Sequence, residues 1–208
     1  MNTINIHSYI SQTRALGPFL RFALWVQGCP LRCQDCMTPA ALPDSGGQLI
    51  AISKLAEQIL NTPDIEGLTI TGGEPFAQAA ALVKLIEQIR LTKDLGVIVY
   101  SGYTLKKLQY TPEVAELMQL IDLLIDSPYV AALNDGASLR GSSNQQVHLL
   151  TERYAAIIND YYGQPKRPVE IHLTKDDVML VGVPGVETLK QWQTQFRSSQ
   201  FKNTETNL

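Results

Sequence analysis

The stretch RFALWVQGCPLRCQDC, residues 21–36, joins an apolar run to a cluster of cysteines. Its first part, Arg21 to Gln27, predicts a buried strand. The strand leads directly into Cys29, Cys33 and Cys36, which are the only cysteines of the chain. Three thiolates are one fewer than a closed tetrahedral zinc site or a saturated cubane cluster requires. A [4Fe–4S] cluster on three cysteines keeps one iron open for a substrate or cofactor, so the spacing favours chemistry over a structural role.

Two other interpretations of the cysteines stay open at this point. A zinc site could complete its ligand set with His7, His148 or His172, although none of them lies at the local spacing of a zinc ribbon. The cysteines could also be incidental core residues, but three of them within eight residues argue against that. Thiolates gathered in one loop meet the needs of an iron–sulfur cluster without help from the rest of the fold, so the spacing favours iron.

The composition is that of an ordinary globular protein. The chain has 208 residues, 45% of them apolar and 18% charged, with a net charge of -3. We expect one core domain over residues 1–185, followed by a C-terminal helix and polar tail over 186–208. The charge gives no reason to expect a nucleic-acid partner, and no apolar run approaches membrane-spanning length. The N-terminus does not resemble a signal peptide, so a cytoplasmic location, where thiols stay reduced, is expected.

Strand and helix patterns alternate along the chain. Strands are expected at 21–27, 68–71, 97–100 and 123–125, and helices at 52–60, 78–90, 105–108, 113–120, 145–158 and 187–196. A hairpin is expected from 169–173 and 178–183 around Lys175-Asp176-Asp177, before a polar tail over 197–208. Alternation of this kind predicts an α/β fold with a parallel sheet. Because the chain is too short for eight βα units, we expect a partial (β/α) barrel that is open on one side.

The second expected strand ends in a motif, Gly72-Gly73-Glu74-Pro75. In parallel α/β folds, ligands bind at the carboxyl ends of the strands, where this motif lies. Glycines have no Cβ, so the backbone there can approach a ligand closely. The alternative is a simple turn in which Glu74 caps the next helix, because carboxylates favour helix N-termini.

Together these motifs resemble the radical S-adenosylmethionine superfamily. The resemblance rests on the Cys-x3-Cys-x2-Cys loop after one apolar strand and on Gly-Gly-Glu-Pro after the next. Several further segments narrow it to activating enzymes of glycyl-radical enzymes, and most resemble those of anaerobic ribonucleotide reductases: Gly17-Pro18 with Arg21, Trp25–Cys33, Tyr100–Thr104, Asp126–Tyr129 and Arg140–Gln145. The chain departs from the family pattern at Phe19 and Asp35, where glycine (or, at the second position, an aromatic residue) is usual, and at Thr38, where asparagine is commoner.

The resemblance implies a chemistry and a set of site residues. Cys29, Cys33 and Cys36 would hold the cluster, whose open iron would bind S-adenosylmethionine for reductive cleavage to a 5′-deoxyadenosyl radical. The implied cofactor contacts are Met37, Gly72, Gly73, Glu74, Ser101, Arg140, Ser142 and Asn144. Plainer roles exist for some of them: Met37 as a core filler, Ser101 as a turn residue, and Ser143 or Asn144 as the cap of the helix expected from Gln145.

The implied function is the installation of a glycyl radical on a partner enzyme of the anaerobic ribonucleotide reductase type. A flavodoxin- or ferredoxin-type protein would donate the electron. Two alternatives differ in testable ways. A stand-alone radical enzyme would modify a peptide or small metabolite, and an electron-transfer or metal-binding module would need neither S-adenosylmethionine nor Glu74.

Overall fold

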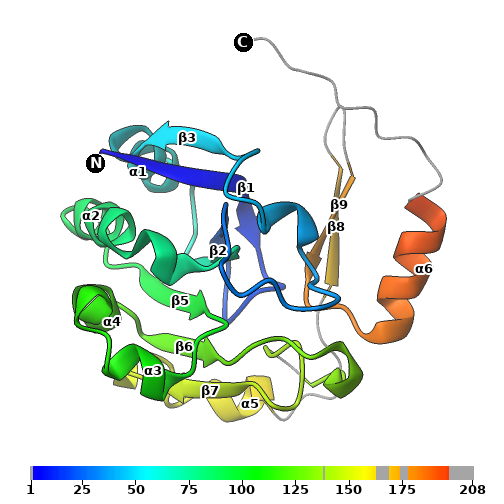
Figure 1. Ribbon diagram of the computed structural model, residues 1–208. Helices are drawn as coiled ribbons and strands as arrows, with labels where there is room; N and C mark the ends of the chain where they lie inside the picture. The colour runs from blue at the N-terminus through cyan, green and yellow to red at the C-terminus, as the bar shows by residue number, and fades with distance from the viewer. Residues whose placement is uncertain (1, 138, 163–168, 174–177, 197–208) are drawn as a thin grey trace.

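The computed structural model describes residues 2–137, 139–162, 169–173 and 178–196 (Figure 1). Within these ranges seven strands form one sheet in the order β3-β1-β2-β4-β5-β6-β7. The four central strands are parallel: β2 (Arg21–Val26), β4 (Gly67–Gly72), β5 (Gly96–Tyr100) and β6 (Leu123–Asp126). Antiparallel strands complete the edges: β1 (Thr3–Thr13), β3 (Gln48–Ala51) and β7 (Gln146–Leu149). A separate hairpin consists of β8 (Val169–Leu173) and β9 (Val178–Gly182).

The helices lie on both sides of this sheet. They are α1 (Ile52–Leu60), α2 (Ala79–Arg90), α3 (Leu105–Gln109), α4 (Ala115–Gln119), α5 (Ile158–Tyr162) and α6 (Val186–Phe196). Short 3-10 turns connect them: η1 (Pro39–Ala41), η2 (Pro75–Gln78), η3 (Pro112–Val114), η4 (Ala131–Leu133) and η5 (Glu152–Tyr154). In Figure 1, α1 to α4 lie to one side of the central strands, and the β8–β9 hairpin and α6 lie to the other. No described helix is both long and apolar enough to cross a membrane.

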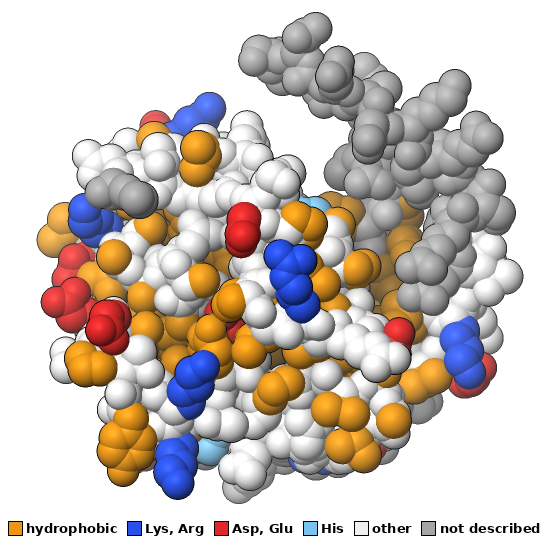
Figure 2. Space-filling model, in the orientation of Figure 1, with side chains coloured by type: hydrophobic (Ala, Val, Ile, Leu, Met, Phe, Trp, Pro, Cys, Tyr) orange, Lys and Arg blue, Asp and Glu red, His pale blue; other side chains and the backbone are white. Residues whose placement is uncertain are grey.

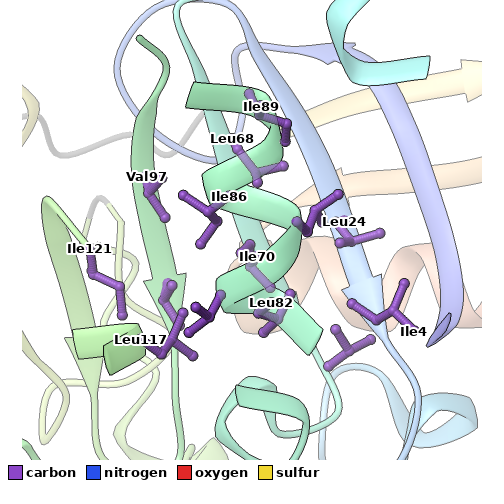
Figure 3. Close-up of a cluster of buried hydrophobic side chains, with 14 of the residues drawn as sticks. Ile4, Leu24, Leu68, Ile70, Leu82, Ile86, Ile89, Val97, Leu117 and Ile121 are labelled. Carbon is purple, nitrogen blue, oxygen red and sulfur yellow. The ribbon is translucent and has the colours of Figure 1, made fainter. Parts of the chain in front are cut away.

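Alternating side chains of the central strands form apolar clusters on both faces of the sheet. On one face, Leu24, Leu68 and Ile70 pack with Leu82 and Ile86 of α2 (Figure 3). On the other face, the next residues along β2 pack against the hairpin, in a cluster of Ala23, Trp25, Ala15, Leu16, Val181 and Val183. Because both faces of these strands are covered, their sequences are largely apolar, as in other parallel sheets.

A buried arginine ties the amino-terminal ends of the parallel strands together. Arg21 opens β2 and is fully buried. Its Nη2 donates to the carbonyl oxygens of Leu68 in β4 (2.9 Å) and Gly96 in β5 (2.7 Å). Its Nη1 donates to Glu66 Oε2 (2.8 Å) and to the Tyr154 hydroxyl (2.8 Å). A charge can be buried here because hydrogen bonds and an ion pair replace its water.

The α/β class and the parallel sheet are confirmed, as are the four predicted central strands and the helices predicted over 52–60, 78–90, 105–108 and 187–196. The stretch predicted as one helix over 113–120 consists of η3 and α4. The described sheet is open, with β3 and β7 at its edges. Closer curvature into a partial barrel stays a prediction. The hairpin is confirmed in its two strands. The expected turn at Lys175-Asp176-Asp177 and the expected tail over 197–208 lie outside the described residues.

The helix predicted over 145–158 is wrong. Residues Gln146–Leu149 form β7, which pairs antiparallel with β6, and only short helical turns follow. The physical reason lies in β6, whose far edge would otherwise carry unpaired backbone groups. Ser143 and Asn144 therefore cap no helix. Two further strands, β1 and β3, were not predicted. They extend the sheet beyond β2, at the edge opposite β7.

Candidate iron–sulfur centre and cofactor pocket

A pocket opens at the carboxyl ends of the parallel strands. Its cavity volume is about 130 Å³. Its wall combines the loops after β2, β4, β5 and β6 with the end of the hairpin. The wall includes Trp25, Cys29, Cys33, Cys36, Met37, Gly72, Gly73, Glu74, Ser101, Gly102, Tyr129, Gly141, Gln145, Gly182 and Val183.

The three cysteines line this one pocket. Cys29 is buried, and Cys33 and Cys36 are half-buried. Burial raises the pKa of the Cys33 thiol, and the nearby charges of Cys29 and Glu74 raise it further. A hydrogen bond from the backbone amide of Tyr129 opposes this rise. Burial likewise raises the pKa of the Cys36 thiol, although the Thr38 amide, 3.4 Å from its sulfur, opposes the shift. Cys29 adds to the pKa rise of both other thiols, and binding a metal would require the cysteines to release their protons.

The two glycines of Gly-Gly-Glu-Pro fit tightly against the start of the cysteine loop. Gly72 has φ of +98°, and a Cβ there would lie 2.7 Å from the backbone nitrogen and oxygen of Val26. A Cβ on Gly73 would lie 2.2 Å from the carbonyl oxygen of Gly28. The Gly73 amide donates to Val26 (2.8 Å) and the Glu74 amide donates to Gly28 (2.8 Å). The glycines are therefore needed to join the ends of β2 and β4, whatever they contact in the pocket.

Glu74 is fully buried at the pocket wall, and its carboxylate is held by donors of the protein. Its Oε1 accepts from the Phe76 amide (3.1 Å) and the Ser101 hydroxyl (2.9 Å), and its Oε2 accepts from the Gly102 amide (2.9 Å). Burial raises its pKa from 4.5 to about 7, although these three donors oppose the rise. The contact to Phe76 caps η2, so the predicted capping role of Glu74 is confirmed. The same side chain still lines the pocket.

The structure brings most of the predicted site residues together. The three cysteines, Met37, Gly72, Gly73, Glu74 and Ser101 all line the pocket. Arg140, Ser142 and Asn144 lie outside its wall. Arg140 pairs with Asp135 (2.6 Å), the Ser142 hydroxyl accepts from the Val130 amide (3.1 Å), and Asn144 donates to the Pro128 carbonyl (2.8 Å). Their contact with a cofactor stays a prediction.

Sequence reasoning missed several residues of the pocket wall. Gln145 accepts from the Gly141 amide (2.7 Å) with Oε1 and donates to the Ser127 carbonyl (2.9 Å) with Nε2. It thereby fixes Gly141, which lies beside the side chains of Tyr129 and Met37. The resemblance contained this segment but pointed to its neighbours. Gly182 and Val183, from the end of the hairpin, gave no signal, because the contact spans most of the chain.

The zinc alternative finds no support in the histidines. His7 Nδ1 lies 3.2 Å from Gln27 Oε1, His148 Nε2 lies 3.1 Å from Asp126 and His172 Nε2 lies 2.8 Å from Glu170. All three belong to the described residues, and none of them lines the pocket. Across the described ranges, no three His, Cys, Asp or Glu side chains converge on one metal ion. A cluster does not require such convergence, because each thiolate binds a different iron.

Two departures from the family pattern share a conformation. Phe19 and Asp35 have φ of +61° and +57°, in the left-handed region that glycine adopts most easily. The backbone at both positions thus has the conformation that glycine adopts easily, and Phe19 and Asp35 adopt it at some cost in free energy.

Comparisons with known proteins agree with this site. The family model described as "4Fe-4S single cluster domain" matches residues 15–148. An anaerobic ribonucleoside-triphosphate reductase-activating protein of Escherichia coli is 30% identical over 158 residues, covering 71% of this chain and 99% of the relative. The chain belongs to that family of activating proteins. A member from Vibrio cholerae is 28% identical over 156 residues, with 71% and 99% covered. One from Salmonella typhi is 32% identical over 155 residues, with 69% and 97% covered.

The pocket of this family member fits a [4Fe–4S] cluster in its donor set. Three soft thiolates from one loop face one cavity, and the neighbouring wall supplies no competing histidine. The carboxylate in this wall, that of Glu74, already accepts hydrogen bonds from Phe76, Ser101 and Gly102. Cys29, Cys33 and Cys36 are therefore the residues that would hold the cluster.

Proposed function

We propose that the chain binds a [4Fe–4S] cluster through Cys29, Cys33 and Cys36 and S-adenosylmethionine in the adjoining pocket. We further propose that it is a radical enzyme that installs a glycyl radical on a partner of the anaerobic ribonucleotide reductase type. One observation carries the proposal: three thiols and a buried carboxylate, Glu74, share one pocket at the carboxyl ends of parallel strands. The names of the relatives supply the partner.

When bound, the reduced cluster would supply one electron, and S-adenosylmethionine would supply the radical that abstracts hydrogen. The residues of the chain would position these groups. The carboxylate of Glu74 would accept a charge-assisted hydrogen bond from the methionyl ammonium. Ser101 and Gly102 already hold that carboxylate by its two oxygens, so it would need no reorientation. Trp25, Met37 and other apolar residues of the wall would exclude water from the reacting groups.

The proposal includes the surroundings of the enzyme. An oxygen-labile cluster with free thiols suits a reducing compartment, so we place the protein in the cytoplasm. The electron would come from a flavodoxin- or ferredoxin-type donor.

The test is anaerobic reconstitution followed by activation of a candidate partner. The chain should take up about four irons and four sulfides. With S-adenosylmethionine, a reductant and the anaerobic reductase of the same organism, electron paramagnetic resonance should show a glycyl radical on the reductase. The radical should be absent without S-adenosylmethionine and with a Cys33→Ala variant.

Three results would contradict the proposal, each in a different way. Binding of stoichiometric zinc with no uptake of iron would contradict the proposed cluster. A loaded protein that does not bind S-adenosylmethionine would fit an electron-transfer module. Rapid turnover of a small metabolite, with no radical on any candidate protein, would fit a stand-alone enzyme.

A further inference from the structure

A buried glutamine joins the two ends of the cysteine loop. Gln27 follows β2 directly and is 3% exposed. Its side-chain Nε2 faces the carbonyl oxygens of Ala40 (3.1 Å), Pro43 (2.6 Å) and Ser45 (3.1 Å) and donates its hydrogens to them. These acceptors lie 13 to 18 residues further along the chain, beyond all three cysteines. One carboxamide therefore bridges the loop at its base.

The backbone beside Gln27 continues the closure. The Gly28 amide donates to the Ala41 carbonyl (2.9 Å), and the Cys29 amide donates to the Leu42 carbonyl (3.0 Å). The returning segment is thus held by residues 27, 28 and 29 in succession. The last of these is the first cysteine, so the position of Cys29 depends on how firmly the returning segment is held.

Further carboxamides hold Gln27 itself. Gln78 Nε2 donates to the backbone carbonyls of Gln27 (3.0 Å) and Asn5 (2.8 Å). The backbone amide of Gln27 donates to the Asn5 carbonyl (3.0 Å), and Asn5 Nδ2 donates to the Asp44 carbonyl (3.3 Å). Because Nε2 of Gln27 faces three acceptors, its Oε1 is the atom that faces His7 Nδ1. The orientation of the Gln27 side-chain carboxamide is therefore fixed at both its nitrogen and its oxygen.

We propose that Gln27 is a positioning residue for the cluster, which holds the cysteine loop closed before any iron is bound. The physical basis is preorganisation: a loop whose ends are already joined loses less entropy when three thiolates are brought together. Without this amide, the iron itself would have to order the loop. The inference rests on the proposed cluster site, and it adds that loop closure precedes metal binding.

Two substitutions separate the hydrogen bonds from the shape of the side chain. Gln27→Met keeps a neutral, unbranched side chain that cannot donate. Gln27→Glu keeps the shape but turns a carboxylate oxygen toward three carbonyl oxygens. Gln12→Met is the matched control, because Gln12 also donates to a backbone carbonyl, that of Pro63 (2.8 Å), at an exposed site on β1.

The first measurement uses the cluster-free protein. Arg32 lies exposed within the cysteine loop, so trypsin cleavage after it, followed by mass spectrometry, reports opening of the loop. Both Gln27 variants should be cut there roughly tenfold faster than the wild type, while cuts elsewhere keep their rates. The second measurement is the loss of iron from the reconstituted protein to a chelator, which should accelerate by a similar factor. The Gln12 variant should match the wild type in both.

Hydrogen exchange of the wild type covers the case in which the variants do not fold. If the loop is closed without iron, the Gly28 and Cys29 amides of the cluster-free wild type should exchange slowly. Free exchange at these amides overturns the inference, as do Gln27 variants that keep wild-type cleavage and iron retention. If the wild type takes up no iron at all, the proposed function fails first, so the two failures are distinguishable.

Discussion

Glu74 should make the stability of the cluster-free protein depend on pH, and Glu74→Gln should remove that dependence. Burial raises the pKa of this carboxyl group from 4.5 to about 7. Between these two values the folded chain keeps a proton that the unfolded chain has released. The stabilising contribution of the proton is therefore complete below pH 4.5 and is lost as the pH rises through 7. A carboxylate with a lowered pKa would give the opposite slope.

The size of the effect follows from the shift. A rise from 4.5 to about 7 corresponds to about 3 kcal/mol of unfolding free energy across the window. Because the side chain is fully buried, solvent does not weaken the effect. The loss is a large part of the stability of a typical domain. Glutamine stays neutral at every pH, but its amide turns a donor toward the Gly102 amide. The absolute stability of the variant can therefore change, and the slope with pH is the diagnostic quantity.

Urea unfolding of the reduced, cluster-free protein at several values between pH 4.5 and 8 measures this slope. The stability of the wild type relative to Glu74→Gln should fall by about 3 kcal/mol as the pH rises. Glu113→Gln, which removes an exposed carboxylate at η3, is the control for the loss of one charge. If the curves of the wild type and Glu74→Gln run parallel, the reasoning about the buried carboxyl group is refuted.

Three further substitutions test the site and its frame. Cys33→Ser should abolish stoichiometric iron uptake in anaerobic reconstitution while the cluster-free protein keeps its melting temperature; unchanged iron content would contradict the cluster. Gly73→Ala should lower the unfolding free energy by about 2 kcal/mol or more, because its Cβ would meet the Gly28 carbonyl oxygen at 2.2 Å, whereas Gly185→Ala, with open space around it, should not. Arg21→Met should cost about 3 kcal/mol or more in urea unfolding by removing the ion pair with Glu66 and the donor to the Leu68 and Gly96 carbonyls, and Arg32→Met, at an exposed position, is its control.

The parallel strands could be predicted because their sequences record burial on both faces. Val97 to Val99 is apolar without interruption, and Leu68 and Ile70 flank a threonine that is itself buried, as the interior of a covered sheet requires. The signal of β1 was weaker. Ile4 and Ile6 are buried between more exposed neighbours, which is the alternation of a strand with one covered face, but a pattern of two residues is too short to decide.

The error at 145–158 has a different origin. Gln145 to Ile158 contains residues that tolerate a helix, and local propensity is decisive only where tertiary contacts do not compete. Here they do compete. Asp126 accepts from the Gln146 amide (3.3 Å), and the Leu150 amide donates to the Asp122 carbonyl (2.9 Å), so both ends of β7 are fastened along β6. These partners lie 20 and 28 residues away, where no local pattern points.

The residues of the site likewise divide into those in local sequence motifs and those brought in by long-range contacts. The cysteines and Gly-Gly-Glu-Pro are local motifs, and the structure brings them together as the topology of parallel strands requires. Tyr129, Gln145 and Val183 reach the same pocket only through long-range packing. Arg140 shows the limit of carrying a motif over: its segment lies beside the pocket, but its guanidinium is bound to Asp135.

The sequence left two roles open for Glu74, a ligand contact and a helix cap, and the structure is compatible with both. A carboxylate can accept about four hydrogen bonds through its two oxygens. Among the described residues, Phe76 and Ser101 donate to Oε1, and Gly102 donates to Oε2. Capping η2 therefore does not exhaust the carboxylate, because Oε2 keeps an acceptor position while the side chain lines the pocket. The cap fixes the direction of the group, and a fixed carboxylate binds a cationic partner without the entropy cost of being ordered first.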